Sequence, residues 1–414
     1  MNRTSLRLAA VVAGLTITAT ACSSNSSSSS DQPSSAATTA APAALKGSAA
    51  VNSQASELRA GLTYLLTEHV YLAGIAIQQA VKDGGDLTKP GTKAAVADLD
   101  ANSVALSKAV GSAYPAAEKP FLASWRQHIG FFVDYTLGKA TKNAAKVAQA
   151  KKDLDGYRTN FGQLIHSVVP ELPADAVAQE LVPHVQSLFA AIDAVVAGSP
   201  DAYSLLQTAA SHMPGTAKIL AGGIATDKKL SGSAMDAAAD LRSGLTYLLA
   251  SHVYDAGIAI HQAVADGGNL MKPGTKAAVA MLDANSVDLS KALGSVYPAA
   301  EKPFLASWRQ HIGFFVDYTL GKATKDNAKV MKAETDLNGY RTNFGQLINS
   351  VVPQLPADAV ATELKPHVAS LFVAINDVVA GSPNTFADLT TAAGHMPGTA
   401  KILAGGIADN KGLA

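Results

Sequence analysis

Histidine is the residue type whose pattern in this chain could support chemistry. The chain contains ten histidines. Eight of them form four pairs that are 183 positions apart: His69 with His252, His128 with His311, His184 with His367, and His212 with His395. We discount the other two, His166 and His261, because Asn349 and Gln78 occupy the paired positions. Neutral imidazole is the commonest metal ligand in proteins and suits zinc, copper, iron or haem.

Each paired histidine falls on the apolar face of a predicted helix. His69 lies at helical spacing between Leu65 and Leu72, and His128 follows Trp125 by three residues. Helical bundles build metal and cofactor sites from such inward-facing side chains. We therefore predict that each copy holds a transition metal (copper, zinc or iron) or haem. The alternative is that these histidines are structural and are satisfied by a carbonyl or carboxylate group.

Other side chains near the histidines are candidate ligands. Glu180 precedes His184 by four residues, which places both on one helix face, as a ligand pair or as a simple hydrogen bond. Met213 directly follows His212, and a thioether with an imidazole suits copper, although methionine also fills cores. Arg126 and Asp134 lie about two turns apart on one side of an aromatic helix, where they contact either other helices or a ligand. The second copy repeats these candidates as Glu363, Met396, Arg309 and Asp317.

Motifs typical of enzymes are missing from the sequence. It contains neither a Gly-x-Ser-x-Gly nucleophile turn nor a phosphate-binding loop, and no Glu-x-x-His pair typical of di-iron proteins. The single cysteine, Cys22, excludes chemistry that needs two thiols. We therefore favour a non-enzymatic protein.

Charge gives a further limit on function. Lys and Arg total 33, Asp and Glu also total 33, and neither sign is concentrated in a block. Nucleic-acid binding is not expected, because the phosphate backbone is bound by a basic face.

The N-terminus has the features of an export signal with a lipid attachment site. Arg3 and Arg7 precede an apolar run, 8–21, which is too short to span a bilayer. Cys22 follows small residues and resembles the acylated cysteine of bacterial lipoproteins, which carries fatty acyl chains such as palmitate. We predict a signal peptide at 1–21 and a lipidated cysteine with a disordered Ser- and Ala-rich tether at 22–55. A soluble secreted protein is the alternative. The expected location is the extracytoplasmic face of the cell membrane, held by the lipid, with an envelope protein as a possible partner.

The rest of the chain is a duplication without gaps. The segment 114–142 recurs letter for letter at 297–325, again 183 residues later. A unit of this size suits an independent domain. We therefore predict two homologous domains, at 56–228 and 239–411, each with its own core.

The hydrophobic period is helical throughout both copies, and strand patterns are missing. The sequence therefore predicts an all-α protein with five or six helices in each bundle. Helix boundaries are predicted at Gly84–Gly85, Pro90, Tyr114–Pro115, 170–173 and His212–Gly215, with Ser199 as an N-cap before Pro200.

Three segments, 125–135, 172–175 and 212–214, resemble alanine-rich helical lipoproteins of unassigned function from actinobacteria. The resemblance implies an envelope location and brings no activity with it. From the sequence we expect an envelope lipoprotein that binds a metal or haem through core histidines. The alternative is a scaffold, or a module that binds a protein or small ligand.

Overall fold

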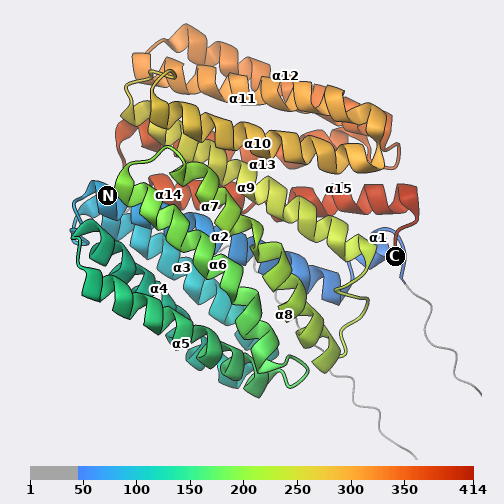
Figure 1. Ribbon diagram of the computed structural model, residues 1–414. Coiled ribbons are helices and arrows are strands. Elements are labelled where there is room, and N and C mark those ends of the chain that lie inside the picture. Colours follow the sequence, from blue (N-terminus) through green and yellow to red (C-terminus); the bar gives the residue numbers. More distant parts are fainter. Residues whose placement is uncertain (1–44) are drawn as a thin grey trace, which may run out of the picture. The chain divides into compact units, whose positions relative to one another are not determined.

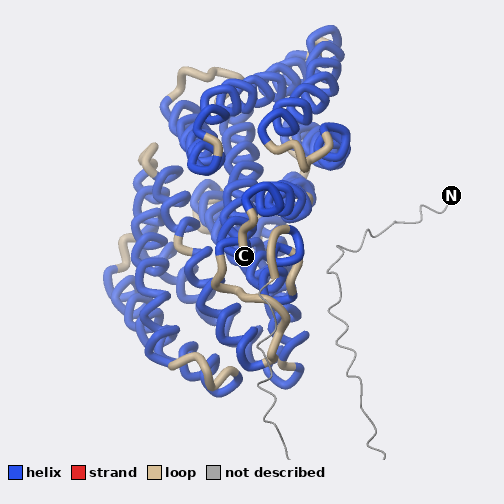
Figure 2. Tube along the Cα trace, turned by 90° about the vertical axis from the view of Figure 1, so that its right-hand side faces the viewer, coloured by secondary structure: helices blue, strands red, loops and turns tan. Residues whose placement is uncertain are grey.

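The computed structural model describes residues 45–414, which form one compact unit. These residues form α-helices and two short 3-10 turns, with no strand among them (Figures 1 and 2). The fold is therefore an all-α helical bundle, which confirms the predicted fold class. The expected signal peptide and Cys22 lie outside the described residues.

The helices repeat with the same offset as the sequence. In the first copy, repeat 1, they are α2 (Gln54–Lys82), α3 (Pro90–Ala113), α4 (Glu118–Ala140), α5 (Ala144–Val168), α6 (Ala174–Ala197), α7 (Ala202–Ser211) and α8 (Met213–Asp227), with the turn η1 (Pro115–Ala117). In repeat 2 they are α9 (Ala237–Ala265), α10 (Pro273–Val296), α11 (Glu301–Thr324), α12 (Asn327–Val351), α13 (Ala357–Ala380), α14 (Thr385–Ala393) and α15 (Met396–Lys411), with η2 (Pro298–Ala300). Each helix of repeat 2 begins 183 residues after its counterpart. Each repeat has seven helices, more than the five or six expected.

Glycine and proline set most of the helix boundaries. Gly84 and Gly85 adopt φ angles of 70° and 82°, which end α2, and Pro90 occupies the first turn of α3. The expected N-cap role of Ser199 is wrong, because α7 begins at Ala202 after Asp201. The Ser199 hydroxyl oxygen instead accepts a hydrogen bond from the backbone N–H of Asp201 at 3.2 Å, within the connecting turn.

The expected tether at 22–55 ends earlier than predicted. Residues Ser48–Val51 form a short helix, α1, which packs against α15, and α2 already begins at Gln54. Ala50 and Val51 are fully buried in this contact. Small side chains that look like linker in the sequence fit here because a helix of the other repeat covers them.

The two repeats meet through their longest helices, α2 and α9, which lie side by side at the centre of the bundle (Figure 1). Tyr71 of α2 stacks on Tyr254 of α9, with ring centroids 5.3 Å apart and planes 9° from parallel. These two residues are equivalent by the 183-residue offset. Their direct contact places a pseudo-twofold axis between the repeats, as in a symmetric dimer.

Reciprocal ion pairs follow the same axis. Arg59 donates to the Ala234 carbonyl at 2.8 Å, and the equivalent Arg242 donates to the Val51 carbonyl at 2.7 Å. Arg59 also pairs with Asp240 at 2.6 Å. Arg242 pairs in the same way with Glu57, the counterpart of Asp240, at 2.9 Å. Both arginines are buried, so each repeat supplies the partner for a cation of the other.

Two buried carboxyl groups flank the stacked tyrosines, and neither exists in the other copy. Glu68 accepts hydrogen bonds from Tyr64 at 2.7 Å, from Tyr254 at 2.9 Å and from Asn102 at 2.7 Å. Asp255 is fully buried and accepts one from Gln207 at 2.9 Å. Burial raises the pKa of Glu68, and it raises the pKa of Asp255 to about 8.

The repeats do not keep separate cores. One contiguous cluster of buried residues extends through both, from Ala50 to Ala408. The domain boundaries expected at 56–228 and 239–411 stay a prediction, because residues 45–414 form a single unit. Because the core is shared, we expect the two repeats to unfold together and not as the independent domains that the duplication suggests.

The buried Asp255 makes a specific prediction about pH. Its pKa is raised in the folded state, so the folded chain holds a proton that the unfolded chain releases above about pH 4. Stability contributed by this group is present below that pH and is lost as pH rises to about 8, at up to about 1.4 kcal/mol per pH unit. Asp255→Asn is therefore expected to flatten the fall in unfolding free energy, measured by urea denaturation between pH 5 and 8. Asp288→Asn, at an exposed position, is the control. An equally steep fall in the Asp255→Asn protein would contradict this assignment.

Candidate functional site

Helices α2 and α4 of repeat 1 bring two histidines into direct contact. Nε2 of His128 on α4 lies 3.3 Å from Nε2 of His69 on α2, a hydrogen bond in which one ring donates its N–H to the bare nitrogen of the other. The equivalent atoms of His311 and His252 in repeat 2 are also 3.3 Å apart. All four side chains are buried. The pair therefore occurs twice with the same geometry.

Aromatic rings hold the imidazoles in place. Trp125, one turn before His128, presents its ring at 4.6 Å and nearly perpendicular to that imidazole, and lies 4.9 Å from the ring of His69. Tyr157 of α5 stacks on His128 at 5.0 Å. Trp308 and Tyr340 take the same positions in repeat 2. This packing fixes the orientation of each ring before any ligand arrives.

A third histidine lies nearby on α6. His184 packs against Phe132, with ring centroids 6.4 Å apart, and is close enough to lower the pKa of His69 and of His128. His367 has this place in repeat 2. Helix α6 continues through Pro183, whose carbonyl accepts a hydrogen bond from Ser187 at 2.7 Å.

Burial keeps these imidazoles neutral. Loss of hydration is the main cause that lowers the pKa of His128 to about 3 and that of His184 to about 4. Repulsion from a neighbouring imidazole adds to each shift, from His184 on His128 and from His212 on His184. The pKa of His69 is also well below its usual value, for the same first cause. Neutral imidazole is the form that binds metals, so protons do not compete at pH 7. The Nδ1 atoms of all three rings lack a hydrogen bond of standard geometry.

A small cavity lies among these side chains in each repeat. In repeat 1 it measures about 20 Å³ and is lined by His69, His128, His184 and Met213, with apolar neighbours. In repeat 2 a cavity of about 50 Å³ is lined by His311, His367 and Met396. Both methionines are buried. Neither cavity is lined by a carboxylate.

His212 and Glu180 lie at the edge of this site. His212 is half-buried at the junction between α7 and α8 and is close enough to His184 to lower its pKa. Glu180 accepts a hydrogen bond from Thr216 at 3.4 Å. Burial raises the pKa of Glu180 and of its counterpart Glu363. His395 likewise lies half-buried beside His367. These four residues do not line the central cavities.

Arg126 and Asp134 point away from the histidines. Arg126 donates two hydrogen bonds to Asp100 of α3, at 2.6 and 2.7 Å, and Asp134 pairs with Lys146 of α5. Arg309 and Asp317 repeat these contacts with Asp283 and Lys329. These candidates therefore connect neighbouring helices.

His166, discounted from the sequence, has a structural contact. Its Nδ1 donates to the Leu172 carbonyl at 2.9 Å, and the amide of Asn349 makes the equivalent bond to Leu355 at 2.8 Å. An imidazole and an amide are interchangeable in this contact.

Tyr157 was not predicted as a site residue, although its helical spacing before Phe161 indicates an inward position.

Together these features define an all-α protein with a duplicated, buried histidine pair. Among residues 45–414, no group of three or more histidine, cysteine or acidic side chains is arranged to hold a metal ion. The expected convergence of three or four histidines is therefore reduced to one contacting pair, with His184 and a methionine beside it. Comparison with protein-family models, curated proteins and solved structures finds no match for the chain.

Proposed function

We propose that this chain is a lipid-anchored envelope protein in which each repeat binds one soft transition-metal ion, Cu(I) above all. The observation that carries the proposal is the 3.3 Å separation of the two Nε2 atoms in both repeats. Two imidazoles that bind one ion at about 2.0–2.1 Å with a near-tetrahedral angle have nitrogens about 3.3–3.4 Å apart. The same distance belongs to the hydrogen bond between the two rings, so we propose that an ion takes the place of the shared proton without a large movement of either nitrogen.

The neutral ligands favour a monovalent ion over a divalent one. A buried charge without a compensating partner is costly, and the cost rises with the charge. No carboxylate lines either cavity, so a divalent ion has nothing there to offset its second charge. A thioether, such as that of Met213 or Met396, also selects Cu(I). Zinc and iron(II) fit this environment less well.

Haem is not part of the proposal. Pockets for ligands of that size usually measure 300 Å³ or more, on the order of ten times the space beside either histidine pair. The surrounding aromatic side chains would have to separate to admit a porphyrin. A single ion needs only a small rearrangement of the rings.

The lipid anchor rests on the N-terminal sequence. Cys22 follows an apolar run with arginines before it and small residues at its end. Two described helices, α2 and α6, are long and apolar enough to cross a membrane by composition alone. However, 83% of the apolar window of α2 is buried inside the bundle, as in a core helix. For α6 the buried share is 39%, and this helix packs within the bundle beside α5 and α7. The proposal therefore places membrane attachment at Cys22.

Copper binding is tested by titrating the metal-free chain with Cu(I) under anaerobic, reducing conditions against a colorimetric chelator. We expect two equivalents per chain. We expect one equivalent for His128→Gln, because the pair in repeat 2 is intact, and none for His128→Gln combined with His311→Gln.

His166→Asn is the matched control, since asparagine is the native residue at the equivalent position 349, and it should still bind two equivalents. If the double variant folds and retains both equivalents, or if the unaltered chain binds none, the metal proposal is wrong and the histidines are structural.

The anchor has its own test. Cys22→Ser should move the chain from the detergent-extracted membrane fraction to the soluble extracytoplasmic fraction, because the acylated sulfur is lost. Ser23→Ala, which leaves the thiol in place, is the control and should stay with the membrane. Immunoblotting of the separated fractions gives the distribution, and membrane retention of the Cys22→Ser protein would refute lipid anchoring.

A further inference from the structure

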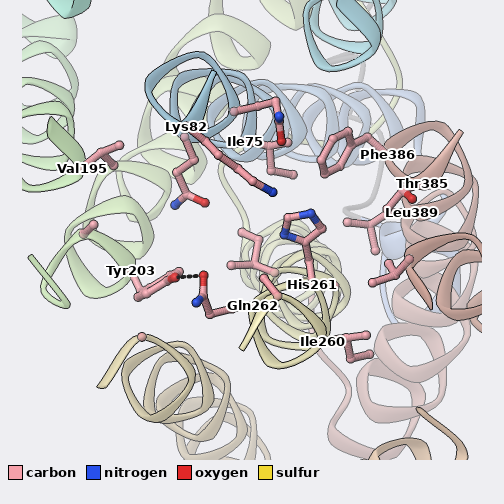
Figure 3. A pocket seen from close by; sticks show the side chains of 18 of the residues that line it. Ile75, Lys82, Val195, Tyr203, Ile260, His261, Gln262, Thr385, Phe386 and Leu389 are labelled. Atoms are coloured by element: carbon pink, nitrogen blue, oxygen red, sulfur yellow. Dashed lines mark hydrogen bonds between the residues drawn. The ribbon is translucent and has the colours of Figure 1, made fainter. Parts of the chain in front are cut away.

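A large cavity lies between the two repeats, away from the histidine pairs. It measures about 470 Å³, within the range of small-molecule sites and far above the space beside either histidine pair. Helices α2 and α7 contribute one wall, and α9, α13 and α14 contribute the other (Figure 3).

The cavity lies on the pseudo-twofold axis. Residues that are equivalent in the two repeats face it from both sides, as Ile75 and Ile258 do, and as Tyr203 and Phe386 do. Much of the remaining wall is apolar, with Leu371 and Leu389 among its residues. Such walls suit the apolar body of a ligand, because both sides release water when it enters.

The polar side chains that line the cavity do not follow the pseudo-twofold symmetry. Gln78 in repeat 1 corresponds to His261 in repeat 2, and Lys82 corresponds to Ala265. Lys82 and His261 therefore give the cavity a cation and an imidazole that have no symmetric counterparts. Figure 3 shows the amino end of Lys82 extending toward the ring of His261, beside Phe386.

Three other polar side chains of the cavity are engaged in hydrogen bonds. Tyr203 donates to Gln262 at 2.9 Å, and Gln262 donates to Asp266 at 3.0 Å. Gln79 donates to Asp83 at 3.0 Å. These two aspartates are held by glutamine and threonine side chains and do not line the cavity.

Lys82 has no such partner. It is exposed at the edge of the cavity and makes none of the ion pairs found in residues 45–414. Neither Asp nor Glu lines the space. Lys82 is therefore the one charged side chain that lines the space, against an apolar surface, while Asp83 and Asp266 lie behind the glutamines.

We propose that this inter-repeat cavity binds a free amphipathic monocarboxylate, with its apolar body between α2 and α9 and its carboxylate against Lys82 and His261. A lysine–carboxylate contact at the edge of an apolar space is charge-assisted and stronger than a neutral hydrogen bond. The imidazole N–H of His261 adds a second donor, held by the ring of Phe386 at 5.8 Å. This site is independent of copper and of the anchor.

Decanoate is a suitable probe, and isothermal titration calorimetry of the full chain in detergent-free buffer at low ionic strength measures its binding below its micelle concentration. We expect one equivalent per chain. Decan-1-ol and decyltrimethylammonium, of matched chain length, should bind at least about tenfold more weakly, since neither presents an anion to Lys82.

Variants locate the site. Lys82→Met should weaken decanoate binding at least tenfold, Lys82→Arg should largely retain it, and His261→Gln, which restores the residue of the other repeat, should weaken it less than Lys82→Met. Lys108→Met removes an exposed lysine elsewhere and should have no effect. Circular dichroism confirms that each variant is folded.

Three results would overturn the proposal: no decanoate binding, binding of the alcohol as tight as that of the carboxylate, or equal binding by the Lys82→Met protein. Many weak equivalents per chain would also overturn it, because they indicate adsorption to exposed apolar surface. All measurements are made without metal, so their outcome is separate from that of the copper titration.

Discussion

The contact between α2 and α9 is the constraint on which the rest of this structure depends. Tyr71 stacks on its own counterpart, Tyr254, and two buried arginines cross between the repeats to carbonyl and carboxylate groups of the other copy. Removing either repeat would leave these buried cations and the apolar face of the remaining helix without partners. The duplication has thus built a closed pair within one chain, with the self-complementary interface typical of a twofold dimer.

The histidine pairs and the inter-repeat cavity use this arrangement in different ways. His69 and His252 lie on the same helices that form the interface, but they face α4 and α11 within their own repeats, so each site is complete in one copy. The cavity needs both repeats, and there the copies have diverged. The residues that differ along α2 and α9 include Glu68, Asp255, Lys82 and His261. These residues lie at or beside the contact between the two repeats. Each is replaced by a different residue type at the equivalent position of the other repeat.

The sequence predicted the features that depend on the local backbone and on helical periodicity. The Gly84–Gly85 turn, the proline before α3 and the inward spacing of His69 and His128 all follow from backbone geometry and helical period. The contact of these two histidines, and the outward direction of Arg126 and Asp134, required the packing of particular helices. Periodicity shows that a face is buried but does not name the helix that covers it. For the same reason the sequence did not predict the pairing of α2 with α9. It also did not predict the ordered structure of residues 48–55, which pack against α15 and α9 of the other repeat. Differences between the copies, such as Leu72 against Asp255, were the sequence signal that could have indicated the interface.

The central claim is that the α2–α9 contact makes the two repeats one cooperative structure. Differential scanning calorimetry of the full chain tests this most directly, because a two-state transition has equal calorimetric and van't Hoff enthalpies. We expect a single transition in which the two enthalpies agree. Two resolved transitions, or a calorimetric enthalpy close to twice the van't Hoff value, would show that the repeats unfold independently and would contradict the account.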